Sequence, residues 1–462
     1  MNAHTAPTRA KPLCESRHLT RVKVLVVGGG GREHAIVRAL QRSGSDLYVV
    51  MGNSNPGIRR AARDVLIHDV SDVPTVVAWA KARGVDLAVI GPEAPLAAGI
   101  VDAFDGAGIP SVGPDREAAR LETDKEFTRE LMREHRIPGL VEYWAFDRIE
   151  AFREWLDDTD IEFVIKPLGL TGGKGVRVWG DHFRTKADAE AYAGEILERK
   201  VGGRARFLVE EKVVGEEFSL QALCDGSRLL WAPIAQDHKR AHENDEGPNT
   251  GGMGSYSDAD HLLPFLTAKD RDAAVATMRA TVDAMAKRGT PFTGVLYGGF
   301  MATRDGVRLL EYNVRFGDPE GMNVLPILED DLLGVCERLA DGNLPAALRF
   351  AKQATVCKYV VPSGYGTKPK AGTPIEVNES WIAKVGADVF YASVEEKDDR
   401  ILTTTSRALA VVGISDSIAK AEAACEAGLR HVKGDVYVRH DIGTAMSIER
   451  KIERIKSLRS AA

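Results

Sequence analysis

Short, fully apolar runs alternate with helical stretches at the start of the chain. The run VKVLVV at residues 22–27 and the runs Leu47–Val50 and Leu87–Ile90 predict buried strands, and helical periodicity covers Val73–Arg83 and Ala97–Ala107. Strands that are apolar on both faces and alternate with helices are typical of a parallel sheet with helices on both sides. We therefore expect an N-terminal α/β domain over residues 21–121.

The middle of the chain changes to paired strands. After a helix at Thr123–His135, the segments EFVIKP, GVRVWG, RFLVEEKVV and EFSLQALCDG predict strands, with little helix except Lys186–Arg199. A long helix at Ala268–Arg288 precedes the strand pair GVLYGGFMA and VRLLEYNVRF, and helix returns at Asp330–Ala340. This pattern predicts an α+β domain over residues 122–353.

The C-terminal part of the chain has predicted strands and helices, whereas the first twenty residues have none. Residues 354–462 contain strands TVCKYVV and ALAVVGI and helices at Ile418–His431 and Thr444–Ile455, which predict a small C-terminal α/β domain. Residues 1–20 show no periodicity and no apolar core of a secretion signal. We expect a dispensable, disordered N-terminal extension there; a weak transit-peptide pattern and an upstream start codon remain as alternatives.

Composition narrows the class of protein. A net charge of -6 argues against a dedicated nucleic-acid binder, which needs clustered Lys and Arg. No apolar run is long enough to predict a membrane span. The five cysteines are scattered without the spacing of a zinc site, which favours reduced thiols and a cytoplasmic protein.

The segment LLEYNVRFGDPE, residues 309–320, carries candidate chemistry. In a strand, Glu311, Asn313 and Arg315 would share one face, and the apolar residues between them would face a core. A half-exposed strand facing water has the same pattern. An acid, an amide and a fixed cation in one row, however, suit a site that binds a metal and an anion.

Three glycine-rich loops are candidates for ligand binding, the first two for phosphate. VVGGGGREHAI follows the first strand; Glu33 stands where a dinucleotide fingerprint has its third glycine, which argues against NAD, and a tight turn or a phosphate loop remains. KPLGLTGGKGV is not a Walker loop but suits a hairpin flap over a triphosphate, with Lys166 and Lys174 as cations. DEGPNTGGMGSYS, after QDHKR, suits a binding loop or a disordered one.

A fourth segment, VEEKVVGEEFSL at residues 209–220, joins two of these loops. It could present backbone groups to an adenine and Glu217 to ribose hydroxyls, although the segment alone favours a solvated charge run.

Together these motifs resemble one family. GGGGREHA, GPEAPL, TDKEFTRELM, KPLGLTGGKGV, VEEKVVGEEFS, QDHKR, GPNTGGMGSYS and EYNVRFGDPE occur in the order found in phosphoribosylamine–glycine ligases (glycinamide ribonucleotide synthetases), which are ATP-grasp ligases. The resemblance spans about Arg21 to Asp441. It implies a Rossmann-like preATP-grasp domain, a two-part ATP-grasp centre with a flap subdomain at about 140–215, and a small C-terminal domain.

The resemblance also implies an activity and its site. Glycine, ATP and 5-phosphoribosylamine would give glycinamide ribonucleotide, ADP and phosphate through a glycyl phosphate, in purine biosynthesis, by a monomer or homodimer. Implied ligands of Mg²⁺ or Mn²⁺ are Glu311 and Asn313, and implied catalytic residues are Arg315, Lys239 and Asp237. Implied contacts are Lys125, Lys166, Gly172, Gly173, Lys174, Glu210, Glu211, Lys212, Val213 and Glu217 for ATP, Gly29, Gly30, Gly31, Arg32, Glu33, Gly91, Pro92 and Glu93 for phosphoribosylamine, and Asn249, Thr250, Gly251 and Gly252 for glycine.

Two departures from the family pattern leave questions. KPLGLTGG and GMNVLP resemble the archaeal-type branch, which often has a glutamine twelve residues before the metal-binding glutamate; this chain has Gly299 there. A water could replace that ligand. Another ATP-grasp carboxylate–amine ligase or carboxylase, or a non-catalytic nucleotide-binding regulator, remains as an alternative function.

Overall fold

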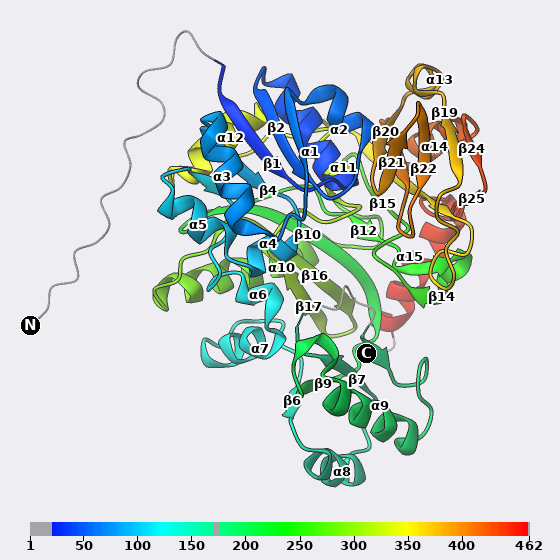
Figure 1. Ribbon diagram of the computed structural model, residues 1–462. Coiled ribbons are helices and arrows are strands. Elements are labelled where there is room, and N and C mark those ends of the chain that lie inside the picture. The colour runs from blue at the N-terminus through cyan, green and yellow to red at the C-terminus, as the bar shows by residue number, and fades with distance from the viewer. Residues whose placement is uncertain (1–20, 170–174, 461–462) are drawn as a thin grey trace, which may run out of the picture.

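The computed structural model describes residues 21–169 and 175–460. A five-stranded parallel sheet in the order β3-β2-β1-β4-β5 forms the first domain, at the top of Figure 1. Its strands are β1 Lys23–Val27, β2 Asp46–Met51, β3 Asp64–Ile67, β4 Leu87–Ile90 and β5 Ser111–Val112, and its helices are α1 Gly31–Arg42, α2 Pro56–Ala61, α3 Val73–Arg83, α4 Glu93–Ala97 and α5 Ile100–Gly106. The predicted parallel α/β domain is confirmed.

An antiparallel sheet in the order β11-β10-β16-β17 forms the centre of the molecule. Helix α10 packs against β16 and β17, where Thr281 Oγ1 lies 2.7 Å from Tyr312 Oη. The elements of this block are α6 Arg120–Thr123, α7 Lys125–Glu134, β10 Gly215–Asp225, β11 Leu229–Trp231, α10 Ala268–Lys287, β16 Thr293–Thr303, β17 Gly306–Asn313, α11 Gly321–Val324 and α12 Leu332–Ala340. The predicted long helix and strand pair are confirmed.

A smaller sheet, β6-β9-β7-β8, forms a separate lobe with α8 and α9 at the bottom of Figure 1. Its elements are β6 Tyr143–Phe146, α8 Ile149–Asp158, β7 Phe163–Pro167, β8 Arg177–Val178, α9 Lys186–Arg199 and β9 Phe207–Glu211. The lobe has its own aromatic core, in which Phe152 of α8 packs edge-on to Phe207 of β9. Helix α8 corrects the expectation of little helix here besides Lys186–Arg199. Ile149, Phe152 and Leu156 give it the apolar stripe of a helix that faces a core.

The C-terminal part supplies most of a six-stranded sheet, β12-β15-β18-β23-β20 with β25 beside β18. Strands β12 and β15 flank the third glycine-rich loop, so this sheet anchors a loop that belongs to the middle of the chain. The elements are β12 Gln236–Asp237, β13 Arg240–His242, β14 Glu246–Asn249, β15 Gly254–Ser257, β18 Ala354–Pro362, β19 Pro374–Val377, α13 Glu379–Lys384, β20 Ala387–Tyr391, β21 Val394–Lys397, β22 Arg400–Thr403, β23 Leu409–Ser415, α14 Ile418–Leu429, β24 Val432–Gly434, β25 Val436–Tyr437 and α15 Ala445–Ser460.

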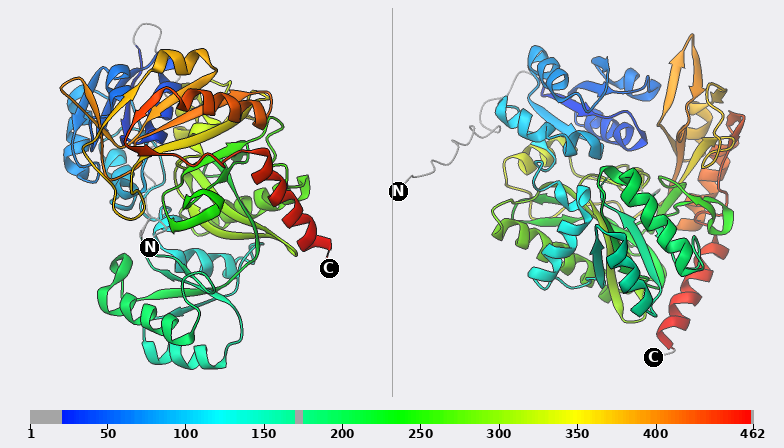
Figure 2. Two further views of the ribbon diagram at one scale, coloured as in Figure 1. Left: turned by 90° about the vertical axis from the view of Figure 1, so that its right-hand side faces the viewer. Right: turned by 60° about the horizontal axis from the view of Figure 1, so that its bottom comes forward.

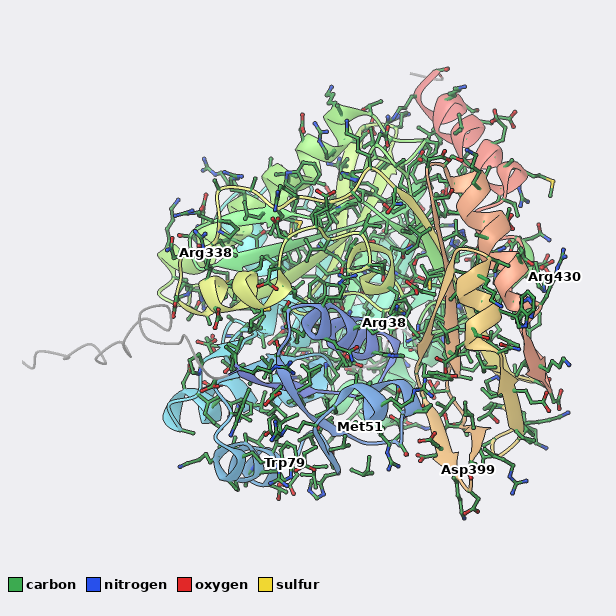
Figure 3. All side chains as sticks on the ribbon, turned by 90° about the horizontal axis from the view of Figure 1, so that it is seen from above. Arg38, Met51, Trp79, Arg338, Asp399 and Arg430 are labelled. Carbon is green, nitrogen blue, oxygen red and sulfur yellow. The ribbon has the colours of Figure 1, made fainter. Side chains whose placement is uncertain are left out.

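Ionic contacts join the C-terminal part to the rest of the molecule. Figure 3 shows the first domain, with Arg38 and Met51 labelled, lying beside the C-terminal strands, and Arg38 Nη2 donates to Asp388 Oδ1 at 2.9 Å. Helix α15 crosses the central block, as both views of Figure 2 show, and its Arg459 forms a two-pronged ion pair with Asp270 of α10. In residues 21–169 and 175–460, no helix is long and apolar enough to span a bilayer.

Candidate active site

Strand β17 presents the two predicted metal ligands toward solvent. Glu311 and Asn313 are half-buried, whereas Tyr312 between them packs into the core, as the alternation predicted. The strand ends at Asn313, so Arg315 is not on the strand face as expected but just beyond it, where its Nη2 donates to Asn313 Oδ1 at 3.3 Å. A bulge opposite Gly299 and Phe300 leaves Leu310 as an extra residue in the ladder.

Lys239 brings the predicted nucleotide, metal and catalytic residues together. Its Nζ lies 3.3 Å from Glu217 Oε2 on β10 and 3.6 Å from Glu311 Oε1 on β17. Glu217 and then Glu311 raise the pKa of Lys239, which burial alone would lower. Burial acts to raise the pKa of Glu311, but Lys239 and the more distant Lys166 and Lys125 lower it. This grouping places a cation and two carboxylates side by side, all partly exposed, and we refer to this cluster of Glu217, Lys239 and Glu311 as the basin.

A buried cationic cluster lies on the flap side of this basin. Glu210 of β9 is 3% exposed and pairs with Arg129 of α7 at 2.8 Å and with Lys166 of β7 at 2.6 Å. Lys166 and Arg129 also donate to the carbonyl of Leu310, the bulged residue, at 3.1 and 2.8 Å. The bulge therefore turns a carbonyl toward the two cations. Sequence reasoning missed Arg129, because nothing near it in the chain indicates its partner.

The other residues predicted to bind ATP contact several different segments of the chain. Lys125 donates to Gly169 O at 3.1 Å, at the entry to the glycine-rich turn, and burial lowers its pKa. Glu211 accepts from the Glu142 N–H at 3.1 Å, and Lys212 pairs with Glu162 at 2.8 Å. Val213 lies in the half-buried connection from β9 to β10. Gly172, Gly173 and Lys174 fall outside the described residues.

The Glu210 cluster should govern part of the acid stability. Although burial raises the pKa of Glu210, Arg129 and Lys166 lower it from 4.5 to about 2. Because the pKa is lower in the folded state, the stabilisation is complete above about pH 4.5 and is lost as the pH falls toward 2. Its size is on the order of 3 kcal/mol.

Glu210→Gln should therefore lower the free energy of unfolding at pH 7, and the deficit should shrink at pH 4 and pH 3. Urea unfolding at each pH measures it, with Asp341→Asn, an exposed turn residue, as the control. A deficit that stays constant over this range would contradict the assigned cause.

Two loops at the carboxyl ends of β1 and β4 meet around Glu33. Glu33 Oε2 accepts from the Gly30 N–H at 2.7 Å, and Arg32 donates to Glu33 Oε1 and to Phe316 O. A side chain at Gly28, whose φ is +122°, or at Gly91 would collide with Glu33. Glu33 and Arg32 are thus buried and engaged within the loop. The other predicted acceptor-site residues, Gly29, Gly31, Pro92 and Glu93, lie in the same two loops.

Arg315 links the first domain to the metal-ligand strand. Its guanidinium lies 3.3 Å from Glu93 and 3.3 Å from Glu122 of α6. Burial acts to raise the pKa of Glu93, but Arg315 lowers it to about 2. Burial raises the pKa of Glu122, whose second oxygen accepts from the Val314 N–H at 2.8 Å. Glu93 and Glu122, which both precede the flap subdomain in the chain, therefore hold Arg315 in place.

The third glycine-rich loop is bonded to the backbone of Lys239. Thr250 donates to Lys239 O through both its N–H and its hydroxyl, at 2.7 and 2.9 Å, and also accepts from the Gly252 N–H. Arg407, from the C-terminal part, donates to Gly251 O and Gly252 O. Asn249 is the β-partner of Arg240 at the base of this loop. No sequence pattern indicated that Arg407 contacts this loop.

Asp237, the last residue of β12, lies against this loop, because a side chain at Gly252 would collide with its Oδ1, and it interacts electrostatically with Glu320. Asp237 Oδ1 is inaccessible to solvent and has no hydrogen-bond partner among the described residues, and Glu320 accepts from Tyr297 Oη at 2.8 Å. Burial, and then Glu320, raise the pKa of Asp237 well above its usual value. The motif NVRFGDPE includes Glu320, but the strand alternation that pointed to Glu311 and Asn313 ends before Glu320. Glu320 was therefore not predicted as a site residue. The pair is suited to a cationic group of a small ligand.

The donor set fits a divalent cation of the hard class. Glu311 and Asn313 offer a carboxylate and an amide oxygen from adjacent positions on one strand face, and Mg²⁺ commonly takes its other ligands from water and phosphates. A side chain starting at Gly299 would lie 3.5 Å from Glu311 Cγ, so glycine leaves that position open. The described part of the chain contains no group of three or more His, Cys, Asp or Glu residues arranged for a metal.

Family comparisons cover most of the chain. Three matching families are described as Phosphoribosylglycinamide synthetase: the N domain matches residues 22–122, the ATP-grasp (A) domain matches residues 123–321, and the C domain matches residues 355–445.

Individual relatives agree with these matches. A phosphoribosylamine–glycine ligase of Methanothermobacter thermautotrophicus is 52% identical, covering 95% of this chain and 100% of its own, and one of Thermococcus kodakarensis is 49% identical with the same coverage. The crystal structure of a phosphoribosylamine–glycine ligase from Thermotoga maritima has a TM-score of 0.79 at 26% identity and covers 91% of this chain and 100% of its own. The biotin carboxylase domain of a Hydrogenobacter thermophilus 2-oxoglutarate carboxylase shares the fold, with a TM-score of 0.71 at 16% identity and 96% coverage of each chain.

Proposed function

The chain belongs to the phosphoribosylglycinamide synthetase family, and from this premise we propose that it joins glycine to 5-phosphoribosylamine at the expense of ATP. The products are glycinamide ribonucleotide, ADP and phosphate, in a step of purine biosynthesis. The observation that carries the proposal is the meeting of Glu311, Glu217 and Lys239 in one basin, within a chain that matches all three family domains. Two carboxylates and a lysine suit a nucleotide, its metal and a transferred phosphoryl group.

The reaction divides into two bond exchanges. A glycine carboxylate oxygen attacks the γ-phosphorus, the bond between the β- and γ-phosphates breaks, and glycyl phosphate forms with ADP. The amine of 5-phosphoribosylamine then attacks the glycyl carbonyl carbon, the carbon–oxygen bond to phosphate breaks, and the nitrogen loses a proton. Phosphoryl transfer depends mainly on positioning and charge neutralisation, which the lysines and Arg315 supply.

A divalent cation, Mg²⁺ or Mn²⁺, would be held by Glu311 and Asn313 and would neutralise phosphate charge when bound. Arg315 orients the Asn313 amide through its 3.3 Å hydrogen bond and can stabilise the acyl phosphate. Lys125 and Lys166 would contact ATP phosphates, as would residues 172–174, while Glu217 would bind the ribose. Glu210, already paired with Arg129 and Lys166, would act on the nucleotide by holding Lys166.

The substrates would enter from two sides. The loops around Gly30 and Gly91 lie at the carboxyl ends of parallel strands, where open α/β sheets bind ligands, and suit 5-phosphoribosylamine. Asp237 and Glu320 suit the ammonium group of glycine, because two buried carboxylates need a cation. A protonated glycine amine cannot compete with phosphoribosylamine as the nucleophile. Closure around the basin must also exclude water, which would hydrolyse glycyl phosphate.

Isotope transfer tests this route. Glycine labelled with ¹⁸O in its carboxylate should place one ¹⁸O atom in each phosphate released, because one carboxylate oxygen leaves with the phosphoryl group. Mass spectrometry of the phosphate and of the ribonucleotide product measures both. Unlabelled phosphate alongside glycinamide ribonucleotide would exclude the glycyl phosphate. ADP release that requires bicarbonate instead of glycine would favour a carboxylase.

The cysteines bear on the cellular compartment of the enzyme. The four cysteines of the described part of the chain, Cys224, Cys336, Cys357 and Cys425, are free and buried, which suits a reducing compartment such as the cytoplasm. A monomer or a homodimer is our proposed assembly.

A further inference from the structure

The segment that follows Lys239 is a hairpin with a closed base. Strands β13 and β14 pair through Arg240 and Asn249, and Lys239 O receives both hydrogen bonds of Thr250 at the base. The hairpin therefore begins at a residue whose side chain lies between Glu217 and Glu311 and ends at the loop Asn249–Gly252.

The tip of this hairpin has an unfavourable backbone. Asn244 and Asp245 have φ of 60° and 57°, in the left-handed region that non-glycine residues seldom adopt. Asn and Asp tolerate this region better than other non-glycine residues, but contacts with neighbouring segments are needed to hold the tip in one position. The tip is largely exposed, so an apolar core does not supply those contacts.

The chain after β25 supplies them instead. Arg439, whose side chain has 0% exposure, donates to Asp245 Oδ1 at 2.9 Å and to Arg240 O at 3.0 Å. Asp441 pairs with Arg439 at 2.7 Å and accepts from the Asn244 N–H at 3.0 Å. The His440 N–H donates to Glu243 Oε1 at 3.0 Å. A buried guanidinium thus holds both the tip and the first residue of the hairpin.

The contact with Arg240 O is one residue away from Lys239. Consecutive Cα atoms are about 3.8 Å apart, so a shift of the Arg240 carbonyl moves the Lys239 backbone directly. Lys239 has a long flexible side chain, and its position between two carboxylates depends on where that backbone is fixed. Displacement of a catalytic group by about 1 Å can cost on the order of 10²-fold in rate.

We propose that Arg439 is a positioning residue: from the C-terminal part of the chain it fixes the hairpin Arg240–Asn249 and, through it, the Lys239 ammonium and the Asn249–Gly252 loop for phosphoryl transfer to glycine. The inference rests on the proposed function. In this proposal the reaction depends on Arg439, although Arg439 itself contacts no reacting atom.

Arg439→Met tests the proposal in the full-length enzyme. We expect kcat to fall about 10- to 100-fold and the KM for glycine to rise, while the KM for ATP stays within about twofold, because Lys125, Lys166 and Glu217 keep their places. Arg459→Met is the matched control, since Arg459 forms a partly buried ion pair with Asp270 away from the hairpin. It should lower the melting temperature and leave kcat unchanged. Asp245→Asn, which removes the charge of one ion-pair partner at an exposed residue, should give a smaller change in the same direction.

Hydrogen exchange reports the positioning without reference to catalysis. The amides of residues 243–250 should exchange faster in Arg439→Met and Asp245→Asn, but not in Arg459→Met. If kcat stays within twofold of the wild type in Arg439→Met, or in Asp245→Asn where Arg439→Met does not fold, the inference is overturned. It is overturned equally if Arg459→Met loses as much turnover. A wild type that releases no ADP in response to both substrates would instead overturn the proposed function.

Discussion

Glu311→Gln is expected to lower turnover by about 10²- to 10³-fold, because it removes the only charged oxygen of the proposed two-residue metal site while keeping its shape. Lys239 would retain Glu217 as a partner at 3.3 Å, so the charge left behind is still paired. The melting temperature should therefore change little. Steady-state ADP release with all substrates present measures the loss, and raising the Mg²⁺ or Mn²⁺ concentration should recover part of it.

The matched control is Asp341→Asn, which also removes one acidic charge, at an exposed turn after α12. Near-normal turnover in Glu311→Gln, with the same metal dependence as the wild type, would show that Glu311 is not a metal ligand.

Arg315→Met should lower both stability and turnover. The substitution leaves the buried Glu122 and the half-buried Glu93 without their shared cation. Breaking a fully buried pair typically costs about 3–5 kcal/mol, and solvent at Glu93 should reduce that cost here. It also removes the guanidinium that orients Asn313. Urea unfolding and ADP release measure the two losses. Arg315→Lys, which keeps the charge but loses the planar fork, should recover more stability than turnover.

The double variant Arg315→Met/Glu93→Gln separates the two roles. Removing one of the uncompensated carboxylates should return part of the lost stability, because the remaining acid is no longer opposed by a like charge. Turnover should not return. Recovery of turnover along with stability would mean that Arg315 only supports the fold and has no part in the reaction.

The sequence predicted the elements whose signals are local. Helix α9 begins and ends where the pattern placed it, since Thr185 caps it and Asp188 completes the capping box. The apolar side of β17 and its two half-buried acid and amide residues also followed from alternation. Helix α8 was missed because the strands around it dominated the pattern, although its apolar spacing is helical.

The contacts that organise the site were beyond sequence reasoning. Arg129 meets Glu210, Arg315 meets Glu93, and Arg439 meets Asp245 across separations of 81, 222 and 194 residues. No local pattern distinguishes such an arginine from one on a solvated surface. The contact of Glu33 with phosphoribosylamine stays a prediction, and no sequence pattern indicated that its side chain accepts a hydrogen bond from the Gly30 N–H of its own loop.

The most direct test of the whole account is ADP release measured with each substrate omitted in turn. Phosphoribosylamine is unstable, so it is generated in the assay from ribose 5-phosphate and ammonia. The account predicts rapid ADP release only when glycine, 5-phosphoribosylamine, ATP and a divalent metal are all present, with one glycinamide ribonucleotide formed per ADP. ADP release that continues unchanged without glycine or without phosphoribosylamine, or that yields no ribonucleotide product, would contradict it.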